Sequence, residues 1–107
     1  MLRCSIYGLY STENGVVRYI GQTKQSLSER LSQHLAEANR PPGSTRCHRW
    51  IRKVIRFGYS VEIVLIEDDC PWNEAEKRWI AFYRSKYPKL MTNISPGGCG
   101  YGAKRSL

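Results

Sequence analysis

Five polar residues of this sequence have side chains suited to proton transfer and to binding ions: Tyr7, Tyr19, Arg30, His34 and Glu76. Phenol and imidazole groups exchange protons, a guanidinium offers a planar fork of donors to anionic oxygens, and a carboxylate is a hard ligand for cations. Each residue also has a structural explanation, since a strand tyrosine commonly packs and a glutamate near a helix start commonly caps. Their value as a site depends on whether the fold brings them together.

The first two elements form a hairpin that places the two tyrosines near each other. Residues 4–10 and 16–21 are rich in aliphatic, aromatic and β-branched side chains, which predicts two strands. Asn14-Gly15 lies between them, and both residue types tolerate a positive φ. We therefore expect antiparallel pairing with Tyr7 close to Tyr19.

A helix follows the hairpin and carries Arg30 and His34. Ser26 and Glu29 have the spacing of a capping box, which predicts a helix start. Arg30 and His34 lie one turn apart, beside a predicted apolar stripe. That stripe repeats every four residues and consists of Leu27, Leu31 and Leu35.

Three more elements complete the predicted fold: a helix over 46–58 that ends at Gly58, a strand over 60–67 apolar enough to be central, and a helix from Asn73 to Tyr87. Asn73 is the expected N-cap, which would put Glu76 at the capping-box position. The apolar faces of the two helices are expected at Trp50, Ile51, Val54 and Ile55, and at Ala75, Trp79, Phe82 and Tyr83. The order ββααβα predicts an α+β (mixed α/β) sandwich, a small, mainly antiparallel three-stranded sheet flanked by helices.

Length and charge limit the classes of protein. The 107 residues predict one domain over 1–107, with a core over about 4–98 and a basic, Gly-rich tail over 99–107. Seventeen Lys and Arg against nine Asp and Glu give a net charge of +8, which favours a polyanionic partner, nucleic acid before a membrane surface. No run is apolar enough to span a bilayer or act as a secretion signal, so we expect a cytoplasmic protein.

The four cysteines do not have the spacing of a metal site. Cys4, Cys47, Cys70 and Cys99 are far apart and include no C-x-x-C pair. Reduced thiols are therefore the better interpretation, ahead of structural zinc.

Five ordered segments together resemble the GIY-YIG nuclease family. They are SIY (5–7), YIG (19–21), GQTKQSLSERLSQH (21–34), EKRWI (76–80) and TNISPGG (92–98), and they span nearly the whole chain. The first segment departs from the family pattern because Ser5 stands where a glycine is usual. The tyrosine of that segment, Tyr7, is intact.

The resemblance implies roles for individual residues. Tyr7 matches the tyrosine of the first motif, which we take as the general base, and Tyr19 that of the second, which would orient water or contact phosphate. Arg30 would stabilise the scissile phosphate, and His34 would assist proton transfer or bind phosphate. Glu76 matches the metal-binding glutamate. Gly21 and Asn93 would support the site, and His48 is a looser match to a further histidine.

The resemblance also implies a cofactor and a substrate. One Mg²⁺ or Mn²⁺ ion per site is expected at Glu76, because the matched motifs contain no second carboxylate for a two-metal clamp. DNA is the expected partner, with no small-molecule cofactor and no membrane, and the enzyme would act as a monomer or a transient dimer on DNA. Expected backbone contacts are Lys24, Arg46, His48, Arg49, Arg52, Lys53 and Arg56.

The favoured function is a metal-dependent DNA endonuclease that cuts one strand per active site. The resemblance further suggests a stand-alone, homing-endonuclease-like domain of a phage, a mobile element or a bacterium. A catalytically inactive nucleic-acid-binding module on the same fold is the alternative. It predicts salt-sensitive binding without cleavage.

Overall fold

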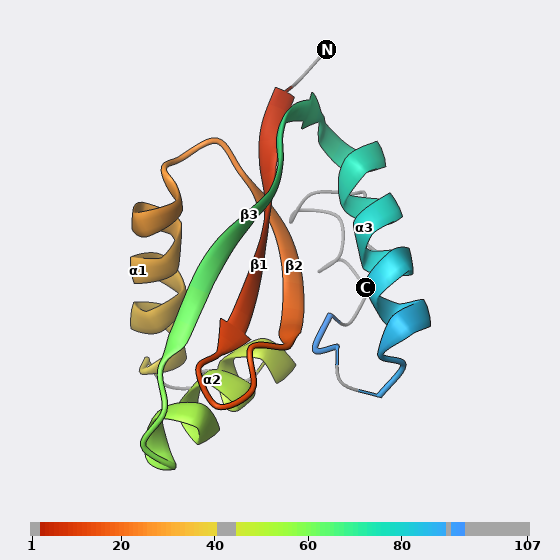
Figure 1. Ribbon diagram of the computed structural model, residues 1–107. Helices are drawn as coiled ribbons and strands as arrows, with labels where there is room; N and C mark the ends of the chain where they lie inside the picture. The colour runs from red at the N-terminus through yellow and green to blue at the C-terminus, as the bar shows by residue number, and fades with distance from the viewer. Residues whose placement is uncertain (1–2, 41–44, 90, 94–107) are drawn as a thin grey trace.

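The computed structural model describes residues 3–40, 45–89 and 91–93 (Figure 1). The elements are β1 Arg3–Ser11, β2 Val17–Thr23, α1 Leu27–Ala38, α2 Arg46–Arg56, β3 Val61–Pro71 and α3 Trp72–Lys86. This order and the three-stranded antiparallel sheet confirm the predicted α+β fold. The predicted Gly-rich tail over 99–107 and the segment 94–98 lie outside the described residues, and the prediction of one domain over 1–107 stays a prediction.

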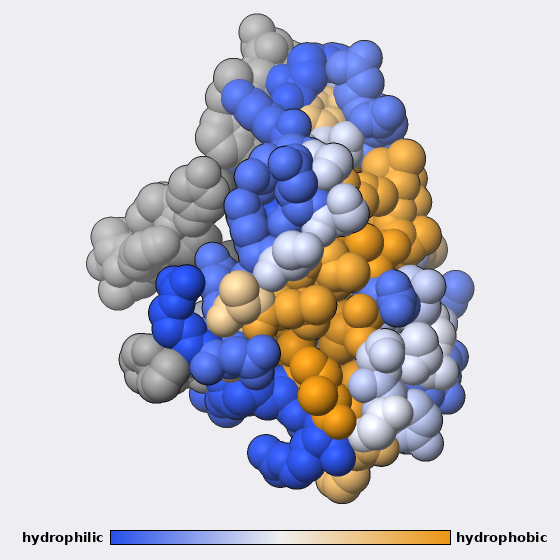
Figure 2. All heavy atoms as spheres, turned by 90° about the vertical axis from the view of Figure 1, so that its left-hand side faces the viewer, coloured by the Kyte–Doolittle hydropathy of each residue, from blue (hydrophilic) through white to orange (hydrophobic). Residues whose placement is uncertain are grey.

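The sheet has the strand order β2-β1-β3, so the prediction that the third strand is central is wrong. β1 pairs with both neighbours, and its residues Ile6, Tyr7 and Leu9 are fully buried. β3 is an edge strand, with Val64 39% and Leu65 46% exposed. An apolar run does not distinguish an edge strand from a central one, because pairing and not hydropathy sets the order. Figure 2 shows a continuous hydrophobic band on the face of the molecule that lies to the left in Figure 1.

The hairpin is present, with a longer turn than Asn14-Gly15 suggested. Residues 12–16 connect β1 to β2, and Gly15 has a positive φ of 72°. Among the described non-glycine residues only Asp69 has a positive φ, so Asn14 does not adopt a two-residue type I′ turn. The Gly15 amide instead donates to the Ser11 carbonyl at 2.9 Å, and the Val16 amide donates to the Asn14 side chain at 3.1 Å.

The two faces of the sheet carry two separate hydrophobic cores. Consecutive residues of a strand point to opposite faces, which is why Tyr7 and Leu9 belong to one core and Cys4 and Ile6 to the other. The first core is closed by α1 and α2, and the second by α3. Figure 1 accordingly shows α1 and α3 on opposite sides of the sheet, with α2 across its lower end.

The first helix begins as the sequence predicts. The Ser26 side chain accepts from the Glu29 amide at 3.2 Å, and the Glu29 carboxylate accepts from the Ser26 amide at 3.2 Å. This reciprocal pair satisfies two amide groups that the helix itself leaves without partners. The predicted stripe of Leu27, Leu31 and Leu35 is partly buried against the first core.

The second helix matches its prediction except at one residue. Trp50, Ile51 and Val54 are buried, but Ile55 is 47% exposed, so its assignment to the apolar face is wrong. The buried fourth member is Cys47, one turn before Ile51. Gly58, with a φ of 89°, follows the C-cap as predicted.

The third helix begins earlier than predicted, and Asn73 is not its cap. α3 starts at Trp72 directly after β3, and its N-cap is Pro71, which makes no side-chain cap bond. The fixed φ of proline is compatible with a helix start, although its side chain offers no acceptor to the first amides of the helix. Phe82 is 49% exposed and Ile80 is buried in its place. The helix therefore does not begin with the capping box that was predicted at Asn73 and Glu76.

No helix among the described residues is long and apolar enough to cross a membrane.

Candidate active site

The Tyr7 hydroxyl is the centre of a buried polar cluster. Tyr7 is fully buried in β1, and its hydroxyl lies 2.7 Å from His34 Nε2. Arg30 Nε donates to the same oxygen at 3.2 Å. Arg30 and His34 reach it together because they are one turn apart on α1, which packs over that face of the sheet.

Tyr19 joins the cluster through its ring. The Tyr7 and Tyr19 ring centroids are 6.3 Å apart, and the Tyr19 and His34 centroids are 5.4 Å apart. The register pairs Tyr7 with Gly21 and Leu9 with Tyr19, so the two tyrosines are diagonal neighbours on one face. The predicted closeness of Tyr7 and Tyr19 is confirmed.

Gly21 provides the space that the Tyr7 ring occupies. A Cβ at position 21 would lie 2.5 Å from Tyr7 Cζ, far inside van der Waals contact. Only glycine at this position lets the phenol cross β2 and reach α1. Packing against the Tyr7 ring therefore explains why the third residue of the YIG tripeptide is glycine.

Replacing Gly21 by alanine is expected to destabilise the fold by about 1–3 kcal/mol, the usual cost of overpacking a filled core. The urea dependence of unfolding measures this cost. A Gly21→Ala/Tyr7→Leu double variant is the control, because the smaller side chain removes the clash and should recover part of the loss. An equal cost in both backgrounds would show that the Tyr7 ring is not the cause.

Burial is the main cause of the pKa shifts of Tyr7, Tyr19 and His34. It raises the pKa of Tyr7 and of Tyr19 above the ordinary value of about 10, and the positive charge of Arg30 opposes this rise without cancelling it. Burial, then the charges of Arg30 and His48, lower the pKa of His34 to about 3. The chain alone thus holds a neutral imidazole beside a neutral phenol.

Glu76 approaches this cluster from the other side of the sheet. It lies on α3 and is half-buried, and its negative charge adds to the burial that raises the pKa of Tyr7 and Tyr19. Its carboxylate is a hard oxygen donor. Such a donor fits Mg²⁺, which prefers oxygen ligands and keeps several waters.

Asn93 fixes the end of the described chain to β2. Its side chain accepts from the Ile20 amide at 3.0 Å and donates to the Ile20 carbonyl at 2.9 Å. Arg84 of α3 donates to the Asn93 carbonyl at 2.6 Å. These bonds connect β2, α3 and the segment 91–93 next to Tyr19.

The first motif tolerates serine at its first position. Ser5 lies within β1, and its hydroxyl donates to Asp68 of β3 at 2.6 Å. Ser5 is half-exposed at this position. The serine therefore adds a bond between β1 and β3, whereas the Tyr7 hydroxyl is bonded to Arg30 and His34.

The cationic residues predicted to contact DNA separate into two groups. Arg46, Arg49 and Lys53 line one groove with Trp50, together with two cations that the sequence reasoning did not single out, Arg18 and Lys89. The Arg18 guanidinium lies 5.5 Å from the Trp50 ring centroid.

The remaining predicted contacts do not line this groove. Arg52 donates to the Ala38 carbonyl at 2.9 Å, which connects α2 to the end of α1. His48 faces Glu37, with its Nε2 3.5 Å from the carboxylate oxygen. Lys24 and Arg56 are exposed elsewhere on the surface.

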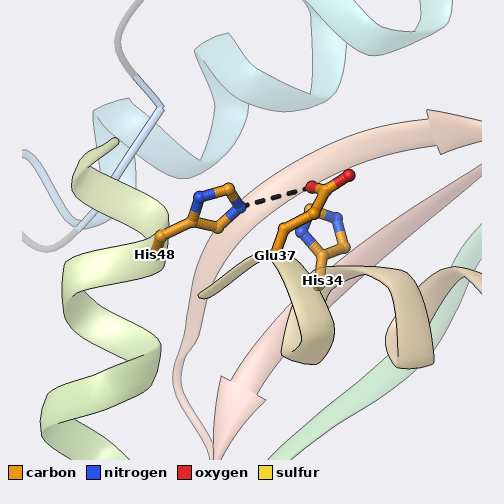
Figure 3. Close-up of side chains that lie close together, drawn as sticks. All are labelled: His34, Glu37 and His48. Atoms are coloured by element: carbon orange, nitrogen blue, oxygen red, sulfur yellow. Dashed lines mark ion pairs between the residues drawn. The ribbon is translucent and has the colours of Figure 1, made fainter. Parts of the chain in front are cut away.

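The sequence reasoning missed Glu37. This residue lies one turn after His34 on α1, and Figure 3 shows its carboxylate in front of the His34 ring and paired with His48. One ligand atom each of His34, Glu37 and His48 lie within 4.8 Å of one another, the one group of this kind among the described residues. The H-x-x-E spacing on α1 was the available signal, but the contribution of His48 depends on how α2 packs.

The fold and the cluster define a small α+β domain whose site combines a buried tyrosine hydroxyl with arginine and histidine. The sequence pattern of the GIY-YIG catalytic domain matches residues 3–88, nearly the whole chain, and the chain belongs to this nuclease family. No curated protein and no solved structure matched it.

Proposed function

We propose that this protein is a metal-dependent DNA endonuclease that hydrolyses one phosphodiester strand per active site. Membership of the GIY-YIG nuclease family supports the reaction class. The observation that carries the proposal is the Tyr7 hydroxyl, held by Arg30 Nε and His34 Nε2 in a buried cluster. A phenol in this setting has an imidazole that can exchange protons and a phosphate-binding cation beside it.

The proposed roles follow from these contacts. Tyr7 is the general base that takes the proton of the attacking water, and the adjacent His34 Nε2 assists that transfer. Arg30 binds the scissile phosphate with its planar donor fork while its Nε stays on the Tyr7 hydroxyl. Tyr19, packed against His34, orients the water or contacts the phosphate.

Glu76 is the proposed ligand of the divalent cation, Mg²⁺ or Mn²⁺. Such an ion neutralises charge on the phosphate oxygens and stabilises the leaving alkoxide when bound. The negative charge of Glu76 is felt at both tyrosines, Asn93 holds β2 through Ile20, and Gly21 leaves room for the Tyr7 ring.

The groove lined by Arg46, Arg49 and Lys53 is the proposed backbone-binding surface. Arg18, Lys89 and the Trp50 ring add charge and an aromatic wall to it. With one active site per chain, cutting both strands would need two successive nicks or a transient dimer on DNA.

Nicking of supercoiled plasmid tests the proposal. The wild-type protein is expected to convert supercoiled to open-circular DNA with Mg²⁺ or Mn²⁺ and to stop when the ion is chelated. Glu76→Gln, which removes the charge and keeps the shape, is expected to lose about 10²-fold or more of the rate, because charge stabilisation in the transition state is lost.

Glu74→Gln is the matched control, since Glu74 is exposed on the same helix and the change in net charge is equal. Equal nicking by the Glu76 and Glu74 variants would contradict the role of Glu76. Tight, salt-sensitive DNA binding without nicking in any metal would instead identify the inactive binding module.

A further inference from the structure

Three potential metal ligands converge where α1 meets α2. His34 and Glu37 come from α1 and His48 from α2, with one ligand atom of each within 4.8 Å of the others. Figure 3 shows the His48 ring turned toward the Glu37 carboxylate, which lies in front of the His34 ring. This group does not include Glu76.

One nitrogen of this group is buried without a partner. The Nε2 atom of His34 is bonded to the Tyr7 hydroxyl, which leaves Nδ1 as the second ring nitrogen. Among the described residues Nδ1 has no hydrogen-bond partner, although His34 is only 3% exposed. Buried polar atoms are nearly always satisfied, so this nitrogen points to a missing ligand.

The donor set identifies the class of that ligand. Two imidazoles and one carboxylate suit zinc and its neighbours in the first transition row, whereas Mg²⁺ prefers oxygen alone. We propose that His34, Glu37 and His48 bind one borderline divalent metal ion of the zinc class, at a site separate from Glu76. Three protein ligands leave a fourth position for water or an anionic oxygen.

The ligands must move slightly closer together to hold such an ion. With metal–nitrogen distances near 2 Å, tetrahedral ligand atoms lie about 3.3 Å apart. The His48–Glu37 separation of 3.5 Å is already close to this. The Glu37 side chain is 44% exposed and so has freedom to adjust, whereas His34 is held by Tyr7.

Metal binding would also fix the hydrogen bond at the centre of the cluster. A metal on Nδ1 leaves the imidazole proton on Nε2, where it is donated to the Tyr7 hydroxyl. The bond that holds His34 in place then becomes the outer support of the metal site. This inference concerns binding alone and does not depend on nuclease activity.

Histidine side-chain NMR tests the site directly, because His34 and His48 are the only histidines in the 107 residues. On titrating the full chain with Zn²⁺, both imidazoles are expected to shift together and saturate at one ion per chain. His34 should show the pattern of an Nδ1-bound, Nε2-protonated ring. Shifts confined to His48, or no saturable shift, would overturn the proposal.

The Glu37→Gln variant supplies the second measurement, with Glu62→Gln on the exposed part of β3 as its matched control. Glu37→Gln is expected to weaken zinc binding by at least about tenfold, since even outer-shell partners are worth that much. Zinc should raise the melting temperature of the wild type and of Glu62→Gln more than that of Glu37→Gln.

The absorption spectrum of bound Co²⁺ distinguishes binding by His34, Glu37 and His48 from binding by the cysteine thiolates. Co²⁺ bound by nitrogen and oxygen gives visible bands without the intense near-ultraviolet thiolate band. That band, or equal zinc affinity in the Glu37 and Glu62 variants, would assign the ion to the thiols or the surface and refute the site.

Discussion

Tyr7→Phe is expected to lower the rate of plasmid nicking by about 10²–10⁴-fold, the usual contribution of a positioned general base. The change removes one oxygen, to which Arg30 donates and which lies 2.7 Å from His34 Nε2. The ring that fills the core above Gly21 remains, so the variant should fold. Circular dichroism and the nicking rate, measured side by side, separate the two effects.

Tyr10→Phe is the matched control, because it removes a tyrosine hydroxyl from the same strand outside the cluster.

The pH dependence of the wild-type nicking rate is a second test of Tyr7 as the base. Burial raises the pKa of Tyr7, so its deprotonated fraction, and with it the wild-type rate, should increase with pH through the neutral range and beyond. Nicking by Tyr7→Phe at the wild-type rate would exclude Tyr7 as the base.

Local signals in the sequence predicted the parts of this fold that depend on neighbouring residues. The Ser26–Glu29 capping box forms because both partners lie within one helical turn. The hairpin forms because a turn connects two apolar segments, and it brings Tyr7 and Tyr19 to 6.3 Å. The contact of Arg30 and His34 with Tyr7 follows once α1 packs on that face.

The errors lie where long-range packing decides. The strand over 60–67 is apolar enough to be central, yet it is an edge strand because β1 pairs with both neighbours. Asn73 is a good N-cap by type, but Pro71 starts the helix two residues earlier.

The same distinction applies to the site. Family motifs predict site residues one by one, and the structure brings together those on β1, β2 and α1. They do not report which side chains of α2 face α1, so they do not predict that His48 lies 3.5 Å from Glu37. The expected DNA contact of His48, and its loose match to a further histidine of the family, stay predictions. Burial raises the pKa of Tyr7, because desolvation outweighs the charge of Arg30.

Arg30→Lys is expected to reduce nicking by about 10²-fold or more even though the charge is kept. A lysine ammonium has no planar fork to bind two phosphate oxygens, and it lacks the Nε that donates to the Tyr7 hydroxyl at 3.2 Å. Arg30→Ala should lose at least as much. Both losses are expected in kcat, because the interaction strengthens as charge builds on the phosphate.

Arg40→Ala is the control for net charge, since Arg40 is exposed beyond the end of α1. Removing one charge there should weaken DNA binding slightly and leave kcat near that of the wild type. If Arg30→Lys nicks as fast as the wild type, a positive charge alone is sufficient. The geometry that joins Arg30, Tyr7 and His34 would then be a feature of packing and not of the reaction.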